Sequence, residues 1–218
     1  MFEQGVKAYP QSGRLLTALG SALFAGALYD QAARRLCEAS DLNPSDRETY
    51  IFMGKIEMAA PNPLPCVEPR LARFALQESQ DPLANYLYGM AIWKQHGEPL
   101  DQQTAQEVRG LLTKTVTIDP KCGDGFLQLG NLDSSQRNYH AAIDSYKKTI
   151  DANSQLSEAH YRLAVAYDRV GDRAKAKQEF QIHDEIEKQQ AAEVDRQRRE
   201  VKQFVVVTQR KPVDRSVR

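Results

Sequence analysis

The chain has few of the features that mark an enzyme, a metal protein or a membrane protein. In its 218 residues no apolar run approaches the length of a membrane-spanning helix. The four histidines, His96, His140, His160 and His183, form no i, i+4 pair and no His-Glu-x-x-His motif. No Ser/His/Asp grouping stands out from the many surface carboxylates. The sequence therefore predicts no catalytic group, no bound metal, no cofactor and no membrane span.

Cysteine content and net charge also indicate no special class. Cys37, Cys66 and Cys122 are an odd number without a Cys-x-x-Cys spacing, which indicates neither a disulfide framework nor a zinc knuckle. We therefore expect three incidental thiols. With 29 basic and 29 acidic residues the net charge is zero, and this balance gives no electrostatic argument for a nucleic-acid partner.

An internal repeat is the strongest positive signal in the chain. The blocks 123–156 and 157–190, each 34 residues long, align without a gap. Apolar and small residues recur in them at helical spacing, and short turns are expected at Arg137-Asn138 and Gly171-Asp172. A 34-residue helix-turn-helix period is typical of arrays in which each helix pair packs on its neighbours. The sequence therefore predicts a helical repeat protein.

The second block contains the string EAHYRLAVAYDRVGDRAKAKQEF, which closely resembles the tetratricopeptide repeat (TPR) family. The resemblance implies an all-α, right-handed superhelical solenoid of helix-turn-helix repeats, with the first helices lining a concave groove. No helix breaker follows Asp172 for a long stretch, so we expect a C-terminal capping helix from Arg173 to about Gln203.

The repeat pattern divides the chain into eight segments. These are 1–12, the end of a truncated preceding repeat; 13–46, a repeat; 47–81 and 82–122, degenerate repeats with loop insertions; 123–156 and 157–190, repeats; 191–203, a helical extension; and 204–218, a flexible tail. Residues 2–10 resemble the last turns of a TPR second helix. This suggests a fragment of a longer chain, and the sequence indicates no cellular compartment.

Proline spacing places the two loop insertions. Pro44, Pro82 and Pro120 are 38 residues apart, so both degenerate repeats exceed the regular length. The extra residues are expected at 61–65 and around 97–99, where prolines stop a helix. In the second helices larger or polar residues replace the expected alanines, and we expect looser packing there: Arg70, Gln77, Val108 and Thr115.

The TPR resemblance also predicts which residues line the concave groove. The set is Ile51, Lys55, Tyr86, Met90, Trp93, Asn131, Tyr161, Val165 and Arg169. Tyrosine, tryptophan and methionine offer large contact areas and are enriched where partners bind. Met90 and Val165 could instead pack between repeats, and Trp93 could fill the third repeat.

The groove lacks the clamp with which some TPR domains capture chaperone C-termini. That clamp uses lysine, asparagine and arginine on three successive first helices to bind a carboxylate. Only Arg162 matches, whereas Thr17, Ser21 and Phe52 stand at three other clamp positions. A hydrophobic or mixed peptide or helix is therefore the expected ligand.

The leading hypothesis is a non-catalytic scaffold that binds a peptide or helix of a partner protein on its concave face. The alternative is an accessory TPR arm of a larger enzyme or sensor whose catalytic domain lies upstream. A further hypothesis is self-association through the apolar residues Phe204, Val205, Val206 and Val207, which have strand-like composition.

Overall fold

The structure, a computed structural model, describes the backbone of residues 2–209 and the side chains up to Val201. Over these residues the chain forms eleven helices and no strand, which confirms the predicted all-α fold. None of the described helices has the length and apolar character needed to cross a bilayer. The helices divide into two compact units, one ending at Asn138 and one beginning at Tyr139. Each unit is described by itself.

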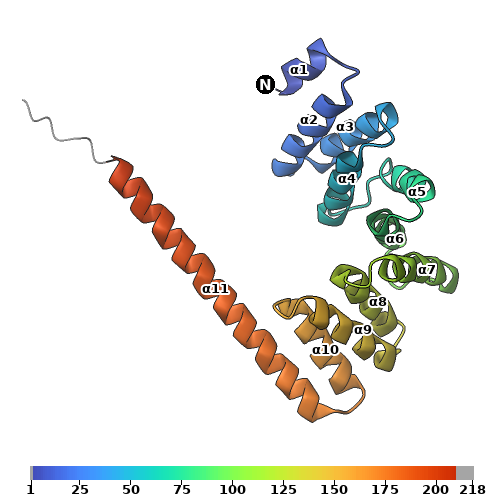
Figure 1. The fold of residues 1–218 in the computed structure, drawn as a ribbon, viewed down its shortest axis with the longest axis vertical. Helices are drawn as coiled ribbons and strands as arrows, with labels where there is room; N and C mark the ends of the chain where they lie inside the picture. The colour runs from blue at the N-terminus through green and yellow to red at the C-terminus, as the bar shows by residue number, and fades with distance from the viewer. Residues whose placement is uncertain (1, 210–218) are drawn as a thin grey trace, which may run out of the picture. The chain divides into compact units, whose positions relative to one another are not determined.

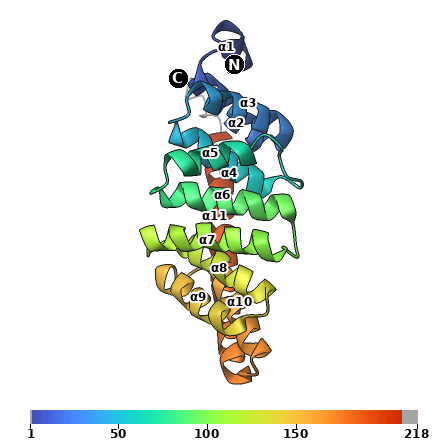
Figure 2. The ribbon, with the colours of Figure 1, turned by 90° about the vertical axis from the view of Figure 1, so that its right-hand side faces the viewer.

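The first unit contains eight helices that pack as sequential neighbours (Figure 1). They are α1 (Phe2–Ala8), α2 (Gly13–Ala25), α3 (Tyr29–Leu42), α4 (Arg47–Ala59), α5 (Glu68–Gln77), α6 (Pro82–His96), α7 (Gln102–Ile118) and α8 (Gly123–Ser135). Figure 2 shows α5, α6 and α7 as successive layers of this unit.

Aspartate caps fix where three of these helices begin. Asp46 accepts a hydrogen bond from the Glu48 amide at 3.2 Å, and Asp81 accepts one from the Leu83 amide at 2.7 Å. Asp101 does the same for α7. A carboxylate at this position satisfies amides that have no partner within the helix. The predicted helix start at Asp81 is confirmed.

Both insertions lie between helices, as predicted. One separates α4 from α5, and the other separates α6 from α7. The expected looseness of the second helices is wrong for α7, because Val108 and Thr115 are fully buried. The Thr115 hydroxyl also donates to backbone carbonyls, so it occupies the place of an alanine without an unsatisfied polar group.

The expectation that all three cysteines are free thiols is wrong. Cys37 on α3 and Cys66 in the loop before α5 form a disulfide, with their Cα atoms 6.3 Å apart. The two residues are separated by 29 positions in the sequence, and only the packing of the loop against α3 brings them together. Cys122 is free, and burial raises the pKa of its thiol. A raised pKa lowers the thiolate population and hence the reactivity of this cysteine.

The second unit contains α9 (Tyr139–Ala152), α10 (Ser157–Arg169) and α11 (Arg173–Gln209). The predicted turns at 137–138 and 171–172 are confirmed, with Gly171 at a φ of 87° that only glycine adopts easily. Buried His160 joins two elements, since its ring nitrogens lie 2.7 Å from Glu179 of α11 and 3.2 Å from the Ser154 carbonyl oxygen.

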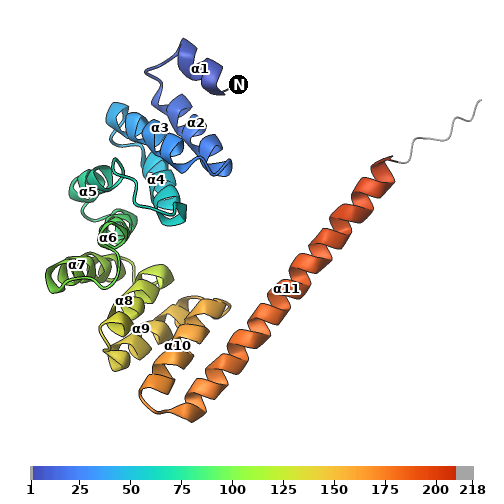
Figure 3. The same cartoon turned by 180° about the vertical axis from the view of Figure 1, so that it is seen from behind.

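The first part of α11 lies beside α10 (Figure 3). Ile186 is buried there, whereas Val194 and Val201 further along the helix are exposed. The helix ends at Gln209, beyond the expected end at Gln203. The backbone at 204–207 is therefore helical, against the strand-like composition. The side chains proposed for self-association lie outside the described side chains, and that hypothesis stays a prediction.

Candidate functional site

The nine residues of the predicted groove lie on four helices. Ile51 and Lys55 are on α4, Tyr86, Met90 and Trp93 on α6, Asn131 on α8, and Tyr161, Val165 and Arg169 on α10. The first six belong to the first compact unit and the last three to the second.

Two of the predicted groove residues are almost completely buried. Met90 and Trp93 are each 8% exposed and belong to a hydrophobic cluster that includes Val108 and Leu112 of α7. Their burial favours the packing role over contact with a partner. Lys55, Tyr161 and Arg169 are exposed, and the other four are half-buried. For these seven residues a role in binding stays a prediction.

A pocket of about 630 Å³ lies on the first unit between α2 and α4, at one end of the predicted stripe. Its lining is mostly polar and includes Arg14, Thr17, Ser21, Asp46, Glu48 and Phe52. Asn43 and Ser45, from the turn between α3 and α4, close one side. The pocket combines several hydrogen-bonding groups with one aromatic ring.

A chain of hydrogen bonds holds the floor of this pocket. The Thr49 hydroxyl donates to Asp46 at 2.7 Å and lies 2.6 Å from the Thr17 hydroxyl. A hydroxyl has one proton, so Thr49 gives its proton to Asp46 and Thr17 is the donor to Thr49. The chain ties α2 to α4 where they cross, and it uses the hydrogen-bonding capacity of Asp46 and Thr17 within the fold.

Arg14 and Glu48 are the charged groups left available at the pocket. Both are exposed, and neither side chain makes a hydrogen bond or ion pair within the described part of the chain. Phe52 is half-buried, and the Lys55 ammonium lies 5.4 Å from the centre of its ring. The pocket can therefore accept a carboxylate, a cation and an apolar group at separate points.

Sequence reasoning missed this pocket for a definable reason. Thr17, Ser21 and Phe52 stand at clamp positions, but hydroxyl and aromatic groups there carry no clamp signal. Arg14 and Glu48 are 34 residues apart and look like ordinary surface charges. One repeat period separates them, and that is the signal that could have paired them. Among the described residues, no three His, Cys, Asp or Glu side chains gather where a metal ion could bind.

Comparison with known proteins gives matches among solved structures only. No protein-family model matches the chain, and no curated protein matches its sequence. A crystal structure of MamA superposes with a TM-score of 0.63 at 22% identity and covers 79% of this chain and 96% of its own. MamA from Desulfovibrio magneticus RS-1 superposes at 0.64 with 17% identity, covering 82% and 96%.

YrrB, described as a TPR protein with an unusual peptide-binding site, superposes at 0.56 with 13% identity and covers 85% of this chain and 91% of its own. Identities this low carry the fold and no functional detail. Together with the adjacent helix pairs and the TPR-like repeat string, these likenesses identify the architecture. The chain therefore has the fold of a tetratricopeptide repeat protein.

Proposed function

We propose that this protein is a non-catalytic interaction scaffold that binds a peptide or helix of a partner protein on the face formed by its first helices. The pocket between α2 and α4 is the observation that carries the proposal. Clefts of roughly 300 to 1,000 Å³ are the usual size of ligand sites in proteins. The pocket belongs to the same helix face as Ile51 and Lys55 of the predicted stripe.

The lining suggests a segment of mixed character. Ser21 already donates to the Ala18 carbonyl and Ser45 to Asn43, so their oxygens are free mainly to accept. The amide group of Asn43 can donate to a peptide carbonyl. Arg14 would pair with an acidic side chain, Glu48 with a basic one, and Phe52 would contact an apolar one. This agrees with the mixed ligand expected from the absent carboxylate clamp.

The likeness to YrrB supports a peptide as the class of ligand, although it does not locate the site. Half-buried Ile51 and Tyr86, with exposed Tyr161, would extend the contact surface on their own units. Arrays of this kind bind extended partners over several repeats. A partner segment longer than the pocket is therefore the simplest proposal.

Selection from a random peptide display library on the full chain tests this function. Synthetic copies of the selected peptides would be titrated by fluorescence polarisation. We expect Phe52→Ala to weaken binding by about tenfold or more, because a buried aromatic contact is worth at least ~1.4 kcal/mol. Glu48→Gln should weaken peptides that carry a basic residue and leave neutral ones unaffected.

Met58→Ala is the matched control, because Met58 is an exposed apolar residue of the same helix outside the pocket. Circular dichroism would establish that each variant is folded. If the selected peptides bind the Phe52 and Glu48 variants as tightly as the parent, the pocket is not the site. If Tyr161→Ala also leaves binding unchanged, the proposal of a first-helix surface fails.

A further inference from the structure

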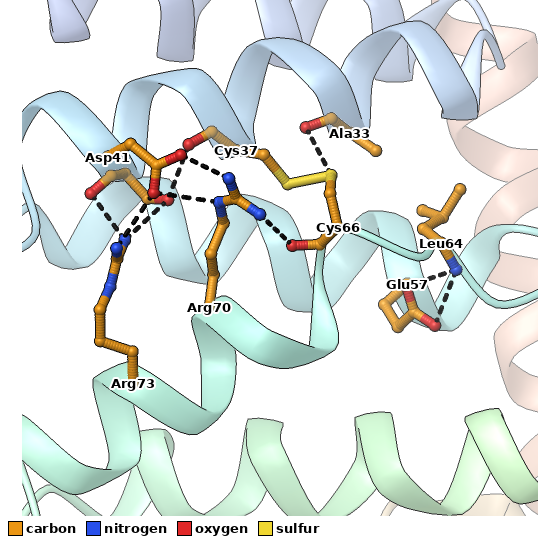
Figure 4. Close-up of a disulfide and its surroundings, with 9 residues drawn as sticks. Ala33, Cys37, Asp41, Glu57, Leu64, Cys66, Arg70 and Arg73 are labelled. Carbon is orange, nitrogen blue, oxygen red and sulfur yellow. Dashed lines mark hydrogen bonds and ion pairs between the residues drawn. A yellow bond between two sulfur atoms is a disulfide. The ribbon is translucent and has the colours of Figure 1, made fainter.

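The loop between α4 and α5 is attached to the rest of the first unit by a disulfide. Cys66 in this loop is bonded to Cys37 of α3 (Figure 4). Cys37 is 3% exposed, whereas Cys66 is half-buried. The bond fixes the end of the loop against α3.

A buried carboxylate holds the middle of the same loop. Both oxygens of Glu57 accept the Leu64 amide, at 3.2 and 3.3 Å (Figure 4). Glu57 is only 2% exposed, and burial raises its pKa although this hydrogen bond opposes the shift. The Lys94 ammonium of α6 donates to the carbonyls of Glu57 and Ala60, at the start of the loop. The loop is thus fastened at its start, middle and end.

Ion pairs continue the attachment into α5. Arg70 and Arg73 both bind Asp41 of α3, with Arg73 at 3.0 Å (Figure 4). Prolines at 61, 63 and 65 restrict the backbone further, because each fixes its own φ and limits the residue before it. A loop with so many attachments keeps one shape before any partner binds. A preformed site loses less conformational entropy on binding than a mobile one.

This rigid loop forms one wall of a second pocket, of about 220 Å³. The other wall is the turn between α2 and α3 and the start of α3. The lining includes Leu28, Tyr29 and Asp30 on that wall, and Pro61, Asn62 and Leu64 on the loop. Leu28 is 46% exposed and Leu64 is buried. Asp30 has no ionic or hydrogen-bonding partner in the described part of the chain.

We propose that this pocket is a second docking site, which takes one apolar side chain of a protein segment with a basic residue next to it, and that the Cys37–Cys66 disulfide keeps the site formed. The volume suits a single leucine-sized side chain. The apolar walls would contact that side chain, and Asp30 at the rim would pair with the cation. No lining residue is shared with the pocket between α2 and α4, so this site is independent of the proposed function.

Reduction should open the site. A dithiol reductant such as dithiothreitol becomes a cyclic disulfide, and its two electrons and two protons convert Cys37 and Cys66 to thiols. Attack is expected at the Cys66 sulfur, because Cys37 is buried. The freed end of the loop would then have more conformations, and binding would have to restrict them again.

The probe is the dipeptide acetyl-leucyl-lysinamide, titrated into the full ¹⁵N-labelled chain and followed by two-dimensional NMR. We expect shift changes at residues 27–31 and 60–64, with a dissociation constant on the order of 1 mM, typical of a small fragment. Leu28→Ala should weaken the dipeptide several-fold. Leu76→Ala is the matched control, because Leu76 is exposed and does not line the pocket.

Two further arms test the charge and the disulfide. Asp30→Lys should reverse the preference, so that acetyl-leucyl-glutamate amide binds better than the lysine dipeptide. Dithiothreitol should weaken binding to the parent but not to a Cys37→Ala/Cys66→Ala variant, which should bind weakly throughout. Circular dichroism would show that the reduced chain stays helical. Shifts outside the two segments, an unaffected Leu28→Ala variant, an unchanged charge preference or an affinity insensitive to reduction would each overturn the proposal.

Discussion

At the scale of single residues, buried polar groups determine how the irregular parts of this protein are held. Glu57 is the clearest case, because its carboxylate lies in the interior and its hydrogen bond goes to one loop amide. Burying an ionised carboxylate is unfavourable unless it is compensated. Asp41 is the opposite case, since hydrogen bonding to Arg70 lowers its pKa. The two carboxylates therefore respond to pH with opposite signs.

We predict that Glu57→Gln changes the pH profile of stability. The raised pKa of Glu57 means that the folded state holds its proton more tightly than the unfolded state does. Its favourable contribution is present below the ordinary glutamate pKa and is lost as pH rises through the folded value. Glutamine stays neutral and can still accept the Leu64 amide. The stability of the variant relative to the parent should therefore increase with pH.

Urea unfolding between about pH 4 and pH 8 measures this difference. Asp41 contributes stability that is lost as pH falls, but both proteins contain it and its effect cancels. Glu98→Gln, at an exposed glutamate after α6, is the control and should leave the profile unchanged. Parallel profiles for the Glu57 variant and the parent would show that burial does not perturb this carboxyl.

At the scale of helices, small residues set how closely the first and second helices of a pair approach. A Cβ atom added at Gly20 on α2 would lie 2.7 Å from Cγ of Leu36, a fully buried residue of α3. By contrast, a Cβ atom at Gly110 on α7 would meet no atom within 4 Å. The same substitution should therefore have opposite effects at the two positions.

We predict that Gly20→Ala destabilises the chain by about 1–3 kcal/mol, as overpacked cores do. Gly110→Ala should stabilise it by roughly 0.5–1 kcal/mol, because alanine restricts the unfolded chain and favours the helix. Chemical denaturation of both variants beside the parent makes the comparison. A Gly20 variant as stable as the parent would mean that α2 and α3 are packed less tightly than the structure has them.

At the scale of the whole molecule, stability in a helical array depends mainly on contacts between neighbours. The disulfide lies wholly within the unit ending at Asn138. In the loop-entropy view, a bond that closes about 29 residues stabilises the fold by roughly 3–4 kcal/mol. Most of that effect should be felt by the helices that it joins.

We predict that reduction increases amide hydrogen exchange in α3, α4 and α5 and leaves α10 and α11 unchanged. Exchange measured by mass spectrometry, with and without dithiothreitol, gives this map. The Cys37→Ala/Cys66→Ala variant serves as the control and should not respond to reductant. An equal increase in both units would mean that the chain unfolds as one cooperative body.

The sequence alone determined the fold class and the positions of most helices. Repeat periodicity, aspartate caps and prolines act between residues that are near in the chain, so the 34-residue alignment, Asp81-Pro82 and the insertions at 61–65 and 97–99 could all be interpreted without coordinates. The groove set was predicted from the family likeness. Burial of Met90 and Trp93 was left open, because the pattern does not distinguish a packed face from an exposed one.

The tertiary structure decided what distant residues do together. The Cys37–Cys66 disulfide, the Glu57 bond to Leu64 and the convergence of Arg14 with Glu48 each depend on how one helix packs against another. Local spacing contains no information on such pairs, since their distance is set by helix crossing and loop path. Short-range chemistry therefore made the helices readable from the chain, while packing alone created the two pockets.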